Sequence, residues 1–68
     1  MNVSAVIKQL RLSLGLEQGE FGNLLGVTPG TISNWENERR YPRLPKLRKM
    51  IEIAKEHKIK LSMQDFLK

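Results

Sequence analysis

The sequence predicts an all-α fold, a compact unit of five short helices that contains a helix-turn-helix. Three observations predict it. Apolar residues recur every three or four positions in residues 3–14 and again in residues 44–54. Gly15 and Gly26 stand where periodic segments stop, and Thr28 followed by Pro29 is a strong helix start. With 68 residues, the chain is one domain with a modest core.

The first predicted helix begins near residue 3 and ends before Gly15. Asn2 or Ser4 can cap its start, because short polar side chains accept hydrogen bonds from free backbone N–H groups. Glycine suits its end, because it takes the left-handed conformation at little cost. The apolar face consists of Val3, Val6, Ile7, Leu10 and Leu14.

The second predicted helix lies in the stretch "LEQGEFGNLLG", residues 16–26, and ends at Gly26. Gly19 and Gly22 weaken it by roughly 1 kcal/mol each relative to alanine. We therefore expect another backbone to approach closely at these two positions. The apolar face consists of Phe21, Leu24 and Leu25.

The third predicted helix runs from Pro29 to about Asn37, with Thr28 as its N-cap. Ile32 and Trp35 are its two large apolar residues, and their spacing of three directs both toward the core. The same spacing makes Trp35 a core residue rather than a stacking platform for a base. The opposite face carries short, uncharged side chains: Gly30, Thr31, Ser33, Asn34 and Asn37.

The stretch "ERRYPRLP" predicts a loop, and Pro45 is placed in the first turn of a fourth helix, where its missing N–H costs nothing. The predicted inner face of that helix consists of Leu44, Leu47, Ile51 and Ala54, with Met50 beside them. "SMQD", residues 62–65, has the pattern of a capping box and predicts a last short helical turn that holds Phe66 and Leu67.

The composition points to a polyanionic partner. A net charge of +5 on a small chain favours nucleic acid, although a solvated basic surface without a partner is the alternative. The absence of cysteine excludes disulfides and thiolate zinc sites, and it fits a cytoplasmic location. There is no signal-peptide pattern and no apolar run of bilayer-spanning length.

Two helices joined at residues 26–28 predict a helix-turn-helix at about residues 17–37, with a recognition helix at about residues 29–37. Such a helix needs short donors and acceptors that face a DNA groove. Asn34 is the best candidate, because asparagine can pair in two ways with adenine. A merely solvated polar face is the alternative. The predicted base-reading residues are Gly30, Thr31, Ser33 and Asn34.

Phosphate contacts are expected at both ends of the recognition helix. Thr28 lies at its start, where backbone N–H groups and the helix dipole favour an anion. Arg39, Arg40 and Arg43 follow its end and are predicted phosphate clamps, with a solvated loop as the alternative. Because an acidic residue beside DNA needs neutralising, we expect Arg11 of the first helix to pair with Glu36.

The sequence contains few residues in patterns suited to catalysis. His57 is the only histidine, and no second or third metal ligand stands at a suitable spacing. The glycines form neither of the common nucleotide-binding loops. The sequence therefore predicts a protein that is not an enzyme and has no cofactor, no metal and no catalytic residue.

From about Ile7 to Leu47, the chain resembles the Cro/cI-repressor (XRE-like) helix-turn-helix family. The resemblance rests on Arg11 and Gly15, on "LEQGEFGNLLGVTPGTISNWEN" and on Pro42. It implies a five-helix, lambda-repressor-like domain that binds operator DNA as a dimer, with half-sites on successive turns of the major groove.

The resemblance also implies roles for single residues. Gln18 matches the glutamine that opens the second helix and contacts the phosphate backbone, and Asn37 matches a phosphate-holding position. Pro29, Gly30 and Asn34 match base-reading positions, and Arg11 with Glu36 matches a buried ion pair.

The chain departs from the family pattern at several of these positions. Pro29 and Gly30 lack side-chain donors, so that specificity is expected to depend on Thr31, Ser33, Asn34 and DNA shape. Glu17 replaces the usual Ser/Thr cap of the second helix. Glu38 stands where the family often has glycine, so we expect Asn37 to take the left-handed turn.

Residues 1–68 are therefore expected to form a single DNA-binding domain of a sequence-specific transcriptional regulator. The expected activity is repression through palindromic operator DNA, bound in the major groove by a homodimer. The alternative is an antitoxin-type module that binds a toxin partner and regulates its own operon. The apolar tail "IKLSMQDFL" is suited to binding either such a partner or a second copy of the chain.

Overall fold

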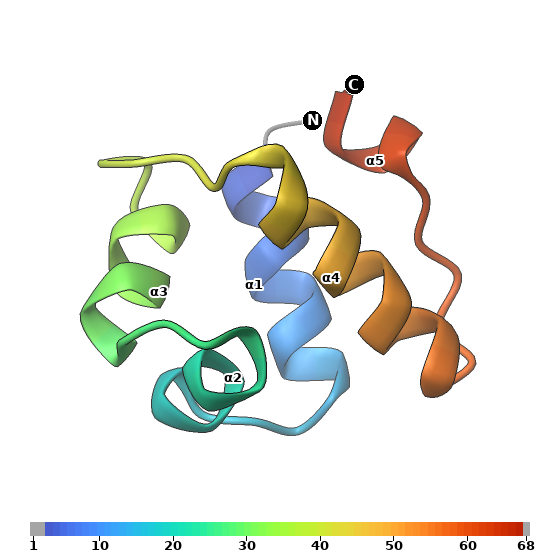
Figure 1. The fold of residues 1–68 in the computed structure, drawn as a ribbon, viewed down its shortest axis with the longest axis horizontal. Helices are drawn as coiled ribbons and strands as arrows, with labels where there is room; N and C mark the ends of the chain where they lie inside the picture. Colours follow the sequence, from blue (N-terminus) through green and yellow to red (C-terminus); the bar gives the residue numbers. More distant parts are fainter. Residues whose placement is uncertain (1–2, 68) are drawn as a thin grey trace.

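The computed structural model describes residues 3–67, which form five helices and no strand, as the sequence predicts (Figure 1). In Figure 1, α1 runs through the middle of the molecule, with α2 and α3 on one side and α4 and α5 on the other. None of the helices in this part of the chain is long and apolar enough to cross a membrane. Their bounds are α1 (Val3–Ser13), α2 (Gln18–Leu25), α3 (Pro29–Glu36), α4 (Leu44–Glu56) and α5 (Met63–Leu67).

Local stereochemistry sets where the first three helices start and end. The predicted roles of Gly15, Gly26 and Thr28 are confirmed. Gly15 and Gly26 follow α1 and α2 with φ angles of 69° and 72°, in the left-handed region that glycine adopts freely. Thr28 caps α3, because its Oγ1 accepts the backbone N–H of Thr31 at 3.1 Å. At α2, the backbone N–H of Glu17 donates to Glu20 Oε1 at 2.8 Å, so a side chain supplied three residues later serves the N-cap position.

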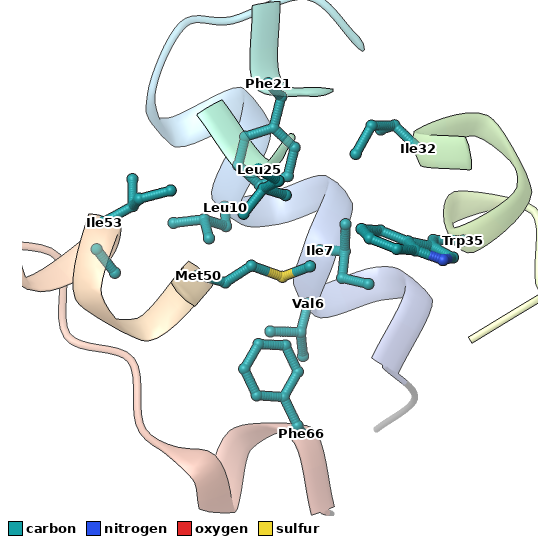
Figure 2. Packing of buried hydrophobic residues seen from close by; sticks show 11 residues of the cluster. Val6, Ile7, Leu10, Phe21, Leu25, Ile32, Trp35, Met50, Ile53 and Phe66 are labelled. Carbon is teal, nitrogen blue, oxygen red and sulfur yellow. The ribbon is translucent and has the colours of Figure 1, made fainter. Parts of the chain in front are cut away.

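The core is formed by side chains of all five helices (Figure 2). Figure 2 shows the Met50 side chain reaching from α4 toward Ile7, while Phe66 of α5 points at Val6. Trp35 is only 5% exposed, which confirms it as a core residue. The buried apolar residues are Val6, Ile7, Leu10, Phe21, Leu25, Ile32, Trp35, Met50, Ile53, Ala54 and Phe66.

The predicted inner face of α4 is partly wrong. Leu44 is 46% exposed, and Met50 and Ile53 are the buried centre of the helix. The spacing of Leu44 from Leu47 suggested a shared face, but Leu44 is the first residue of α4. Side chains on a helix lean toward its N-terminus, so the side chain of a first residue projects past the end of the helix rather than onto its neighbours.

The prediction that Asn37 takes the left-handed turn after α3 is wrong. Glu38 adopts it, with a φ angle of 61°, whereas Asn37 has a φ angle of −101°. The reason is that the backbone N–H of Asn37 continues the helical pattern to Ser33 O at 2.9 Å. The reversal of the chain therefore comes one residue later.

The predicted capping role of Ser4 is also wrong, and Asn2 lies outside the described residues. Ser4 is buried in the first turn of α1, and its hydroxyl donates to the backbone carbonyl of Trp35. The carbonyls of the last turn of a helix lack partners within the helix, so this bond satisfies one of them at the end of α3. Ser4 thus joins α1 to α3.

Candidate nucleic-acid interface

The turn between α2 and α3 is closed by backbone contacts. The N–H of Val27 donates to Gly22 O at 2.8 Å, and the N–H of Gly26 donates to Asn23 O at 3.3 Å. A methyl group on Gly22 would lie 2.7 Å from Val27 O, inside the van der Waals limit. The expected close approach of a backbone is therefore found at Gly22. It is wrong for Gly19, where a methyl group would only meet the side chain of Pro29, at an ordinary 3.6 Å.

These two glycines give a matched pair of stability tests. Gly22→Ala is expected to lower the free energy of unfolding by about 1–3 kcal/mol, because its methyl group forces the turn apart. Gly19→Ala is expected to raise it by up to about 1 kcal/mol, because alanine loses less backbone entropy in a helix. Urea unfolding followed by circular dichroism measures both. Equal stability of the two variants would show that the turn is not packed against Gly22.

The α3 helix has one buried and one outward face. Ile32 and Trp35 are buried, while the predicted base-reading residues all retain solvent exposure: Gly30 is exposed, and Thr31, Ser33 and Asn34 are half-buried. Local bonds already engage some of them. Thr31 Oγ1 lies 3.0 Å from Thr28 Oγ1, and Ser33 Oγ accepts from Asn37 Nδ2 at 3.2 Å.

Asn34 differs from these neighbours in that its bonds run through the backbone. Its backbone carbonyl accepts hydrogen bonds from the backbone N–H groups of Arg39 and Arg40 at 2.9 and 3.3 Å, which folds the chain back beside α3. Its side-chain amide bonds to no other residue in the range 3–67. The donors and the acceptor of this amide are therefore available, as the base-reading role predicted for Asn34 requires.

Residues 39–43, the arginine segment, form most of the connection between α3 and α4, and Arg39, Arg40 and Arg43 are exposed there. The segment and α3 border a common cleft, so the structure brings base-reading candidates together with two of the three arginines. Arg39 does not line this cleft, and neither do Gly30 and Ser33. The lining residues are Thr31, Asn34, Trp35, Arg40, Tyr41, Pro42, Arg43, Pro45 and Lys46.

Two residues of this cleft escaped the sequence reasoning. Tyr41 is 59% exposed. The sequence feature that could have identified it is an aromatic residue placed between arginines. Lys46 donates through Nζ to Leu25 O at 2.6 Å. A lysine in the first turn of a helix is unfavourable next to the positive end of that helix's dipole, which hints at a partner elsewhere.

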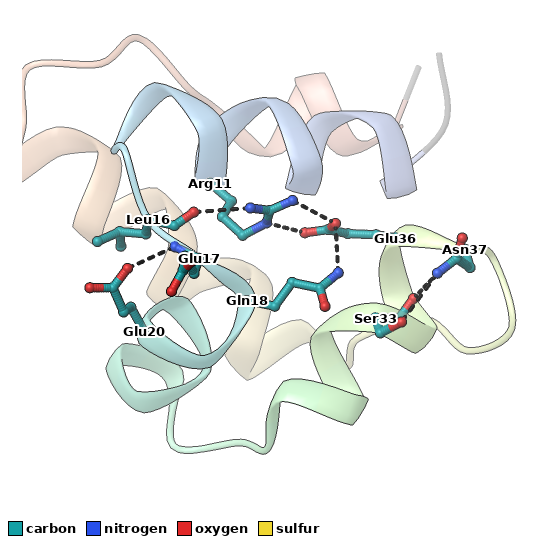
Figure 3. A network of polar contacts seen from close by, with 8 residues as sticks. All are labelled: Arg11, Leu16, Glu17, Gln18, Glu20, Ser33, Glu36 and Asn37. Carbon is teal, nitrogen blue, oxygen red and sulfur yellow. Dashed lines mark hydrogen bonds and ion pairs between the residues drawn. The ribbon is translucent and has the colours of Figure 1, made fainter.

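A polar network joins α1 to both helices of the motif (Figure 3). Arg11 donates from Nε to Glu36 Oε2 at 2.6 Å and from Nη2 to Glu36 Oε1 at 3.0 Å, a two-pronged pair in which the two side chains are 12% and 5% exposed. Nη1 of Arg11 donates to Leu16 O at 2.9 Å. Gln18, expected at the phosphate backbone, is half-buried and donates from Nε2 to Glu36 Oε1 at 3.2 Å.

The ion pair shifts the pKa of both Arg11 and Glu36. Burial raises the pKa of Glu36, but the hydrogen bonds from Arg11 and Gln18 and the charges of Arg11 and Lys8 together outweigh it, so the pKa lies below its ordinary value. For Arg11, the hydrogen bond with Glu36 raises the pKa against the opposing effect of burial. Both groups are therefore charged at neutral pH, and Arg11 neutralises the Glu36 carboxylate at the end of α3.

The remaining predicted positions are placed as follows. Thr28 and Asn37 are exposed at the start and the end of α3, and Asn37 folds back to donate to Ser33 O at 2.8 Å. His57 caps the end of α4, with Nδ1 2.9 Å from Ile53 O. Within residues 3–67, no three His, Asp or Glu side chains gather as a metal site would require.

Comparison with known protein families shows what the chain is similar to. A family model described as helix-turn-helix matches residues 7–62, which cover α2, α3, α4 and the arginine segment. No curated protein and no solved structure matches the chain.

Proposed function

The chain belongs to the XRE-type, Cro/cI-like helix-turn-helix family of DNA-binding transcription regulators, and from this premise we propose that it is a repressor of palindromic operator DNA. Residues 1–68 act as a single DNA-binding domain, and a homodimer places two copies of α3 in successive turns of the major groove. Family membership makes double-stranded DNA the partner.

One observation carries the proposal furthest: Asn34, whose side-chain amide bonds to no other residue in the range 3–67, lines the cleft that Arg40 and Arg43 also line. Base contacts specify and phosphate contacts position, so a site that reads operator DNA needs both kinds of group side by side. We assign base reading to Asn34, with Gly30, Thr31 and Ser33 beside it. Gln18, Thr28, Asn37, Arg39, Arg40 and Arg43 bind the backbone.

In-vitro selection of bound duplexes from a random pool tests the proposal as a whole. The expected product is a two-fold symmetric sequence whose half-sites are about 10 base pairs apart, centre to centre. A selection that yields no enriched sequence, although duplex is retained at low salt, would contradict sequence-specific binding.

Asn34→Ala is expected to relax base preference at one or two positions of each half-site. The loss of discrimination should be about 1–3 kcal/mol, because a paired amide distinguishes adenine from the other bases. Repeating the selection with the variant measures it. Gln64→Ala, an exposed substitution on α5, is the control and should select the wild-type sequence. An unchanged preference in Asn34→Ala would move base reading to other residues.

The antitoxin alternative depends on the tail, residues 59–67. Phe66 is buried, and Ile59 and Leu61 are half-buried against the core, so most of the apolar surface of this segment is used within the chain. Leu67 remains 74% exposed. This distribution favours the repressor. Neutralisation of a growth-inhibiting protein encoded beside this chain would favour the antitoxin instead.

A further inference from the structure

Lys46 makes a bond that α4 itself does not require. Its Nζ donates to Leu25 O at 2.6 Å, and Leu25 is the last residue of α2. Carbonyls at the end of a helix lack partners within the helix and carry partial negative charge, so an ammonium group there is stabilising. The contact spans 21 positions of the sequence and is partly buried.

Lys46 lies in the first turn of α4, where a lysine needs a partner outside its own helix. Lys46 follows Leu44 and Pro45, and the first turn of α4 has no acidic residue. A cation in the first turn is disfavoured by the dipole of that helix. The carbonyl at the end of α2 offsets this cost, so Lys46 ties the beginning of α4 to the end of α2.

The arginine segment is thereby held at both ends. At its start, the backbone N–H groups of Arg39 and Arg40 bond to Asn34 O, near the end of α3. At its end, Arg43 O accepts the backbone N–H of Lys46 at 3.0 Å, so Arg43 and Lys46 share one turn. The last turns of α2 and α3 therefore both fix the segment that carries the arginines.

We propose that Lys46 is a positioning residue for DNA binding, which aligns the arginine segment with the helix-turn-helix through Leu25 O and does not itself bind phosphate. This inference rests on the proposed function. Pre-organisation of the segment removes an ordering cost at the moment of binding. That cost does not depend on salt, whereas each phosphate contact does.

The test compares operator affinity across a salt series. Lys46→Met is expected to weaken binding roughly three- to tenfold at every salt concentration, with the slope of log K against log salt unchanged. Arg43→Gln is expected to make the slope shallower by about 0.9. Lys49→Met removes the same charge from an exposed position of α4 and should stay near wild type, and Lys46→Arg, which keeps a cationic donor, should restore affinity.

Two results would overturn the proposal. A slope shallower by about 0.9 in Lys46→Met would make Lys46 a direct phosphate contact, and an affinity equal to that of Lys49→Met would make it irrelevant. The amide ¹⁵N resonance of Gly26, which shares a peptide group with Leu25 O, reports the bond in the free protein. It should move in Lys46→Met and not in Lys49→Met, in spectra that remain dispersed.

The proposed function fails separately. If the wild-type chain ignores every duplex at low salt, the repressor proposal and the role of Lys46 in binding are both overturned, while the Gly26 resonance still reports the bond to Leu25. If the wild-type chain binds its operator and Lys46→Met binds it as tightly as the control Lys49→Met does, the repressor proposal stands and the positioning role is lost.

Discussion

Arg11→Met is expected to lower the free energy of unfolding by about 3 kcal/mol, which is the upper end of the loss expected for Gly22→Ala. The variant leaves the Glu36 carboxylate, whose side chain is 5% exposed, without its ionic partner. A buried charge without a partner costs far more than the pair contributes. In a chain of 68 residues, the core is expected to supply no more than about 3–5 kcal/mol, so this loss should bring the fold close to unfolding. Urea unfolding at pH 7 measures it.

The double variant Arg11→Met, Glu36→Met is the matched control. Replacing both partners with apolar side chains removes the uncompensated charge, so its stability should return to near that of the wild type. A cost below about 1 kcal/mol for Arg11→Met alone would indicate that solvent reaches the carboxylate and that the pair is a surface interaction.

The same pair predicts an acid limit. The pKa of Glu36 is lowered in the folded protein, so its stabilising contribution is present above the ordinary value of 4.5 and is lost as pH falls from there through the folded pKa. Stability of the wild type should therefore drop below about pH 4.5 more steeply than that of the double variant, which lacks the titrating group. Parallel profiles would show that Glu36 titrates normally.

Removal of the three arginines is expected to have the largest effect on binding. Arg39→Gln, Arg40→Gln, Arg43→Gln should make the slope of log K against log salt shallower by roughly 2.7, which corresponds to a loss of a hundredfold or more in affinity at about 0.1 M salt. The loss should be similar for operator and random duplex, because phosphate contacts carry no sequence information. Fluorescence anisotropy over a salt series measures both quantities.

A variant of equal charge separates contact from overall electrostatics. Lys55→Gln, Lys58→Gln, Lys60→Gln also removes three cations, all exposed and all outside the cleft that borders α3. Its slope should stay close to that of the wild type. Equal slopes for the two triple variants would mean that the chain attracts DNA through its net charge alone.

Much of the fold could be predicted because its signals are local. Pro29 fixes its own φ angle, and Thr28 accepts a hydrogen bond from an N–H group only three residues away. Gly15 and Gly26 adopt positive φ angles because they have no Cβ that would clash with the backbone. The buried positions of Ile32 and Trp35 followed from spacing on a single helix. The errors at Leu44 and Asn37 arose at helix ends, where a shift of one residue changes which side chain projects past the end.

The sequence by itself determined which segments of this protein are helical, where the helix-turn-helix lies and which of its faces is polar, because each depends on residues a few positions apart. Tertiary structure alone decided that Lys46 donates a hydrogen bond to Leu25, that Ser4 donates one to Trp35 and that Gln18 donates one to Glu36. Those partners are 21, 31 and 18 positions apart. A polar side chain can turn toward many groups, and only the packed helices bring one of them within hydrogen-bond reach.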